Sequence, residues 1–155
     1  FDRDGELAFG GSVHQDVLQV YMKDPYFAQK PPKSLDRNKW DIQIAAHLSN
    51  HDGAATLAAL TAFAAKKGQE HFPAPVKTWL ISGGGRKNPV IIKFLETFLD
   101  APVRPVEDAG WDGDMLEAEG FAWLAVRHLL NLPLSVPGTT GVPEPMTGGV
   151  LHKAR

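Results

Sequence analysis

The chain has 155 residues, of which 43% are hydrophobic and 22% charged, and 16 Lys and Arg stand against 18 Asp and Glu for a formal net charge of −2. This composition is typical of a globular domain with one hydrophobic core, and the absence of cysteine excludes disulfide frameworks, thiolate zinc sites and cysteine nucleophiles. The charge is nearly balanced, no block of Lys or Arg occurs and no apolar run could span a bilayer, so we expect neither nucleic acid nor a membrane as partner.

The N-terminal third contains turn signals and short helical candidates. The acidic segment 2–5 is typical of a turn, although two carboxylates beside a glycine could also face a cleft. Ser12 is predicted to cap a helix over residues 13–22, where apolar side chains recur at helical spacing. A shorter helix is predicted over residues 36–41, and the stretch from there to residue 50 is ambiguous.

The clearest helix is the alanine-rich stretch from Gly53 to Lys67. Asp52 is predicted to cap this helix, and Gly68 is predicted to end it. Because the stretch is apolar nearly all round, we expect it to be buried on more than one side.

Two short strands with a helix between them are predicted next. The first covers Val76 to Ile81, and Asn88-Pro89 is typical of the start of a helix that runs through Leu99. The second strand covers residues 103–106. Alternating strands and helices favour an α/β layer with a mostly parallel central sheet and flanking helices.

A long helix to about Leu130 is expected to close the ordered part of the chain, with Asp112 or Asp114 as its cap. From Pro133 onward the sequence is rich in Pro, Gly and Thr and is predicted to be irregular. One domain, or one lobe of a larger fold, is therefore expected.

Gly83, Gly84 and Gly85 carry the strongest local signal, because they follow the first predicted strand and precede a helix. Glycines at the end of a parallel strand let a ligand approach the backbone, and the N–H groups of the following helix favour phosphate. The segment matches neither a Walker A loop nor Gly-x-Gly-x-x-Gly. The pattern alone leaves a nucleotide contact and a plain turn equally open.

Glu117 stands apart from the acidic residues before it, because it lies in the first turn of an otherwise apolar helix. It is expected either to cap that helix, which the pattern favours, or to meet a ligand. His47 and His51 are four residues apart, but Leu48 occupies the position where a zinc protease motif has Glu, so helix-surface histidines are preferred over a metal site. No metal ligand is assigned.

Taken together, several segments resemble the C-terminal half of the anhydro-N-acetylmuramic acid kinases. The likeness spans nearly the whole chain in the right order, and the second and fourth segments are the most particular to that family. The segments are Phe1-Asp2-Arg3-Asp4-Gly5-Glu6-Leu7-Ala8, Pro25-Tyr26-Phe27 with Pro31-Pro32-Lys33-Ser34-Leu35, Ile81-Ser82-Gly83-Gly84-Gly85-Arg86-Lys87-Asn88-Pro89, and Glu117-Ala118-Glu119-Gly120-Phe121-Ala122-Trp123-Leu124-Ala125. The tail from Asn131 to Gly141 is also similar to the family's ending.

The resemblance implies an actin-like, ribonuclease H-like ATPase fold of two lobes, with residues 1–155 as the C-terminal lobe. It implies ATP and Mg²⁺ as cofactors and a cytoplasmic step of peptidoglycan recycling, in which 1,6-anhydro-N-acetylmuramic acid becomes N-acetylmuramic acid 6-phosphate. Nucleotide binding would map onto Gly83, Gly84, Gly85 and, less directly, Asn88, and the sugar would lie near Glu117.

The departures from the family pattern concern catalysis. The family's phosphate loop and its catalytic base, an Asp expected just upstream of Phe1, are absent from this sequence, and Asp36 replaces an expected glycine. No catalytic residue is therefore assigned in this chain, and the isolated piece is expected to be inactive without the missing N-terminal lobe. A chain that opens at Phe1 is expected to be a fragment or a processed piece.

Two rival hypotheses stay open. One is a non-catalytic nucleotide-binding or interaction module built on the same half-fold, and the other is a different sugar or acid kinase of the actin-like superfamily. The kinase hypothesis predicts that the helices around residues 56–65 and 121–130 partly face another lobe. The oligomeric state is left open, a homodimer included.

Overall fold

The computed structural model describes residues 2–152, apart from the side chains at positions 37 and 42. Its helices and strands are α1 Glu6–Phe9, α2 Gln15–Met22, α3 Asn50–Gln69, β1 Trp79–Ile81, α4 Pro89–Phe98, β2 Val103–Pro105, α5 Leu116–Leu129 and α6 Pro137–Thr140. Short 3-10 helices lie at Arg3–Gly5, Pro25–Ala28, Arg37–Lys39, Ile42–Ala45, Gly84–Lys87 and Val106–Ala109. No helix in the described range is long and apolar enough to cross a membrane.

β1 and β2 form a parallel pair, with Trp79 opposite Val103, and α4 makes the connection between them. The predicted α/β arrangement with parallel strands is therefore confirmed. Both strands are shorter than predicted. β1 begins at Trp79 rather than Val76 because its partner strand begins only after Pro102, whose carbonyl accepts the Trp79 N–H at 2.8 Å. β2 ends at Pro105, and the next residue starts a 3-10 helix.

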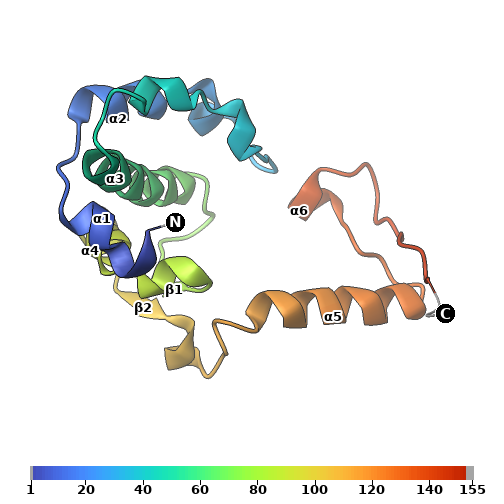
Figure 1. Cartoon of the computed structure of the whole chain (residues 1–155). Helices are drawn as coiled ribbons and strands as arrows, with labels where there is room; N and C mark the ends of the chain where they lie inside the picture. The colour runs from blue at the N-terminus through green and yellow to red at the C-terminus, as the bar shows by residue number, and fades with distance from the viewer. Residues whose placement is uncertain (1, 153–155) are drawn as a thin grey trace.

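α3 lies in the middle of the N-terminal body of the molecule, with α1, α2 and α4 packed around it (Figure 1). Its buried residues are Ala55, Thr56, Ala58, Ala59, Leu60 and Ala62, so the expected burial on more than one side is confirmed. Against α2 it joins a cluster in which Phe27 meets Phe63 with ring centroids 5.3 Å apart. Toward α4 and the sheet, Ala62 packs with Leu95 and Leu99. Small side chains let the neighbouring helices approach α3 closely.

The cap predicted for α3 is wrong. Ser49 caps the helix by accepting the Asp52 N–H at 3.1 Å, so α3 begins at Asn50. Asp52 instead accepts the Ser12 N–H at 2.8 Å, across 40 positions of sequence. Ser12 therefore does not cap α2, which begins at Gln15, and Gly68 lies inside α3 rather than beyond its end. A carboxylate can accept a hydrogen bond from any N–H group nearby. The tertiary fold places the Ser12 N–H within hydrogen-bond distance of Asp52, so Asp52 binds this group instead of capping the helix.

Residues 36–41 do not form the predicted helix. The structure has a 3-10 helix at Arg37–Lys39 and another at Ile42–Ala45, with the Asp41 carboxylate accepting the Gln43 N–H at 2.9 Å. Asp and Asn side chains compete with the helix for backbone N–H groups and favour such short turns.

α5 extends away from the body of the molecule, and the chain then turns back so that α6 lies above α5 in the view of Figure 1. Contacts with the returning tail include the Arg127 Nε–H, which donates to the Pro133 carbonyl at 2.6 Å. No residue of α5 is buried, and Phe121, Trp123 and Leu129 are 66%, 58% and 65% exposed. The apolar surface of α5 is thus largely uncovered within residues 2–152.

Neither Asp112 nor Asp114 caps α5, contrary to the prediction. The N-cap residue is Met115, and its side chain makes no capping hydrogen bond. Asp112 stabilises the preceding turn, where its Oδ1 accepts the N–H groups of Asp114 and Met115 at 2.9 and 3.2 Å. Asp112 does not cap the helix because α5 begins only at Leu116, later than the pattern indicates, so the N–H groups that Asp112 accepts belong to the turn before the helix.

Candidate functional site

The glycine loop follows β1 directly. Gly83 has φ +68° and ψ −173°, a backbone conformation that strongly favours glycine, and the 3-10 helix from Gly84 follows it. A Cβ added at Gly83, Gly84 or Gly85 would meet no atom within 4 Å. The backbone therefore requires glycine only at position 83, and the surface over Gly84 and Gly85 is open to a ligand.

A cavity of about 350 Å³ connects this loop with the start of α5. Its lining residues are Ser82, Gly83, Gly84, Gly113, Asp114, Leu116 and Glu117. The fold thus brings Gly83 and Gly84 together with Glu117, which the chain separates by more than thirty residues. Gly85 does not line this cavity and lies in the 3-10 helix beside it.

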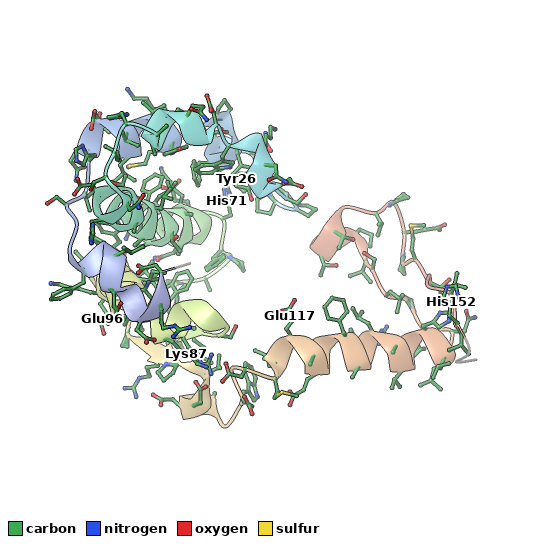
Figure 2. All side chains as sticks on the ribbon, in the orientation of Figure 1. Tyr26, His71, Lys87, Glu96, Glu117 and His152 are labelled. Carbon is green, nitrogen blue, oxygen red and sulfur yellow. The ribbon has the colours of Figure 1, made fainter. Side chains whose placement is uncertain are left out.

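Glu117 is exposed at the first turn of α5. In the described part of the chain its carboxylate makes no hydrogen bond to a helix N–H, so the capping role that the pattern favoured is not seen. Figure 2 shows its side chain projecting from the start of α5 on the side that faces α6. Its carboxylate is therefore available at the edge of the cavity.

Asn88 is only 8% exposed and caps α4, as predicted. Its Oδ1 accepts the N–H groups of Val90 and Ile91 at 3.0 and 3.2 Å. Its Nδ2 donates to Asp2 Oδ2 at 3.4 Å. Asn88 does not line the glycine-loop cavity but a second one of about 540 Å³. Its amide groups are thus occupied by the protein itself.

The acidic segment at the N-terminus forms a turn, and one of its two carboxylates, that of Asp2, also lines a cavity. Asp2 accepts the N–H groups of Leu7 and Ala8 at 2.8 and 3.2 Å, and so holds the start of α1. The same residue lines the larger cavity together with Asn88. Asp4 takes a left-handed backbone conformation with φ 53° inside the turn.

Arg86 is the main feature of the site that the sequence analysis missed. Its side chain is 8% exposed, and Nε donates to Glu107 Oε1 at 2.9 Å. Nη1 donates to the Gly83 carbonyl at 2.9 Å and to Asp114 Oδ1 at 3.0 Å. Lys87 Nζ also contacts Asp114, at 2.8 Å. The sequence did contain a signal for these contacts. Arg86 and Lys87 follow the first parallel strand and acidic residues follow the second, and the carboxyl ends of parallel strands meet at the same edge of a sheet.

These contacts shift the ionisation of the groups involved. Hydrogen bonds from Arg86 and then Lys87 lower the pKa of Asp114 to about 2. In return, the hydrogen bond to Asp114 and, after it, that to Glu107 raise the pKa of Arg86. Asp114 and Arg86 are therefore both charged at neutral pH and form an ion pair.

The histidine pair does not form a metal site with other ligands. Among residues 2–152, no group of three or more His, Asp or Glu side chains could hold a metal ion together. The ring of His51 lies against Gly10, where an added Cβ would be 2.9 Å from the His51 Cδ2 atom.

A family model described as anhydro-N-acetylmuramic acid kinase matches residues 1–154. The chain belongs to this family. It is 50% identical over 151 residues to the anhydro-N-acetylmuramic acid kinase of Roseobacter denitrificans. The match covers 96% of this chain and 40% of that kinase. The kinases of Zymomonas mobilis and Acidiphilium cryptum are 47% and 51% identical, and the matches cover 98% and 96% of this chain.

The chain spans about 40% of the length of these kinases. The resemblance inferred from the sequence is thereby confirmed, and the chain corresponds to only part of a transferase.

Within the segment particular to the family, Lys33 has a structural role. Its Nζ donates to the carbonyls of Tyr26 and Phe27 at 2.9 and 3.2 Å and lies 4.5 Å from the centroid of the Tyr26 ring.

Proposed function

We propose that the full-length protein is an ATP-dependent kinase that phosphorylates 1,6-anhydro-N-acetylmuramic acid while opening its anhydro ring. The observation that carries this proposal is the shared cavity, in which Gly83 and Gly84 face Glu117. Membership of the family supplies the substrate class. The product is N-acetylmuramic acid 6-phosphate, formed in the cytoplasm as a step of peptidoglycan recycling.

The reaction balances with one water molecule. Water attacks C1 of the sugar, the C1–O6 bond breaks, and O6 takes the γ-phosphoryl group of ATP as ADP leaves. The water gives up its proton to a base, which we place upstream of residue 1. Such a transfer depends on holding ATP, sugar and water in line, with positive groups near the phosphate oxygens.

The residues of this chain have binding roles in the proposal. The open backbone at Gly83 and Gly84 lets the nucleotide approach, with Gly85 beside it. Asn88 does not touch the nucleotide in this proposal. Its side chain caps α4, and its backbone N–H donates to the Gly85 carbonyl of the glycine loop. Glu117 accepts a hydrogen bond from a hydroxyl of the sugar across the same cavity. Mg²⁺ would neutralise phosphate charge, and we assign it no ligand among the described residues.

A two-lobed actin-like architecture is the form we propose for the whole enzyme. The exposed apolar side chains of α5 support it, because several large apolar side chains left uncovered on one helix favour an interface. Phe121, Trp123 and Leu129 would be covered by the remaining part of the kinase. Glu117 starts the same helix, so the second lobe would close over the sugar from this side.

The direct test is to incubate the full-length protein with ATP and 1,6-anhydro-N-acetylmuramic acid and to identify the product by mass spectrometry. We expect N-acetylmuramic acid 6-phosphate and ADP in equal amounts. N-acetylmuramic acid itself is the matched control, since it has a free 6-hydroxyl but no ring to open. Equal turnover of the control would contradict the coupling of phosphorylation to ring opening.

The isolated 155-residue chain provides the second arm of this test. We expect it to make no sugar phosphate and to self-associate through the uncovered surface of α5. A monomeric isolated chain that binds nucleotide, beside a full-length protein without kinase activity, would instead favour a non-catalytic binding module. Turnover of other sugars in preference to the anhydro sugar would indicate a different kinase of the same superfamily.

A further inference from the structure

Arg86 joins three segments that meet beyond the carboxyl ends of the two strands. Its guanidinium donates to the Gly83 carbonyl in the loop after β1, to Glu107 in the 3-10 helix after β2, and to Asp114 in the turn before α5. We propose that Arg86 is a positioning residue, which holds the glycine loop and the start of α5 at a set separation and so places the nucleotide against the sugar. This inference rests on the function proposed above.

The environment of Arg86 makes it a positioning group rather than a phosphate ligand. Its side chain is 8% exposed and does not line the cavity shared by the glycine loop and Glu117. Two carboxylates, those of Glu107 and Asp114, already compensate its charge. A guanidinium has donors on several nitrogens in one plane, which suits it to hold three acceptors at once.

The position of Gly113 leaves room for the contact between Arg86 and Glu107. It is buried, and an added Cβ would overlap the guanidinium of Arg86 and lie 2.8 Å from Glu107 Oε1. Its N–H donates to Glu107 Oε1 at 3.3 Å, and its carbonyl accepts the Gly83 N–H at 3.2 Å. The backbone of the turn before α5 therefore lies directly against the glycine loop, with Arg86 between the charged groups.

The position of Glu117 depends on the same contacts. α5 has no buried residue, so its packing in the described chain fixes it only weakly. The hydrogen bonds at Gly113 and Asp114 act three to four residues before Glu117, at the end of the helix where the cavity lies. Loss of Arg86 would let the loop and the helix start move apart, and a shift of about 1 Å is enough to weaken a bound transition state strongly.

The test compares Arg86→Gln and Arg86→Lys in the full-length protein with Arg104→Gln as the matched control. Arg104 is 58% exposed, and it pairs with Asp108 at 3.4 Å. Nucleotide affinity is measured by equilibrium titration with ATP in the absence of sugar, and KM is measured for both substrates. We expect Arg86→Gln to weaken ATP binding roughly ten-fold and to raise the KM for the sugar, with the Arg104 variant unchanged.

Arg86→Lys should rescue little, because a single ammonium cannot reach three acceptors in the fork geometry of arginine. A lower unfolding temperature with unchanged ATP affinity and unchanged KM values would overturn the inference, since a merely structural residue would act in that way. If Arg86→Gln does not fold, Asp114→Asn removes the charge of one partner and should shift the same constants less; unchanged constants there would also overturn it. Absence of sugar phosphate from the wild-type protein would refute the proposed function, and the ATP titration would still decide the role of Arg86.

Discussion

A Cβ atom at position 5 would lie 2.5 Å from the side-chain oxygen of Asn88, which is far away in the sequence. Gly5 also has φ +76°, so both its backbone and its surroundings require glycine. The oxygen it would meet is the one that caps α4 behind the glycine loop. The N-terminal turn therefore packs closely against the start of α4, and a side chain at position 5 would prevent this packing.

Gly5→Ala should destabilise the full-length protein by about 1–3 kcal/mol, because it combines a left-handed backbone with displacement of the Asn88 cap. Urea unfolding measures the change. Gly53→Ala is the matched control, since Gly53 lies inside α3 and an added Cβ there meets nothing within 4 Å. The control should stabilise the protein by about 0.5–1 kcal/mol. Equal stability of the two variants would contradict the role given to Asn88.

Gly84→Val should raise the KM for ATP roughly ten-fold or more and leave the unfolding temperature nearly unchanged. A Cβ added at position 84 meets no described atom within 4 Å, so we expect a bound nucleotide to be the group that the new side chain obstructs. Steady-state kinetics at saturating sugar checks this. Gly68→Val, at another glycine with open surroundings, should not alter the KM. Unchanged ATP dependence in a folded Gly84→Val enzyme would mean that the loop is only a turn.

Glu117→Gln should raise the KM for the sugar about ten-fold and affect the KM for ATP less. The variant keeps the size of the side chain and removes the charge that we place against the sugar. Glu119→Gln is the control, because Glu119 is also an exposed acidic residue in the first turn of α5. An effect on thermal stability alone would return Glu117 to a helix-terminal role, in which its charge only complements the helix dipole.

The ion pairs of Asp114 should make stability depend on acid pH. Because Arg86 and Lys87 lower the pKa of Asp114 from 3.8 to about 2, the folded state holds the charged form more tightly than the unfolded state does. This contribution is complete above about pH 4, shrinks as the pH falls from 3.8 toward 2, and is lost below that. Urea midpoints of wild type and Asp114→Asn should therefore converge as the pH falls from 5 to 2.5. A gap of constant size would show that the pairs do not act through this charge.

Local patterns were enough to predict the elements whose signals lie within a few residues. Asn88-Pro89 starts α4 as expected, because the cap and the first helical position are adjacent in the chain and need no distant partner. The parallel strands followed from strand, helix and strand in sequence. The family also followed from residues in order along the chain, and the comparison with known kinases confirms it.

Tertiary structure decided which donor each acidic side chain satisfies. Asp52 has the spacing of a helix cap, yet it accepts the N–H of Ser12, while Ser49 caps α3. Glu117 has the position of a first-turn carboxylate, yet it lies at a cavity with Gly83 and Gly84. Arg86 gave no local signal, because two of its three acceptors, Glu107 and Asp114, come from segments 21 and 28 residues further along the chain. Sequence spacing determines which groups lie on one helix face, but only the packing of whole elements determines which distant groups are close enough to bond.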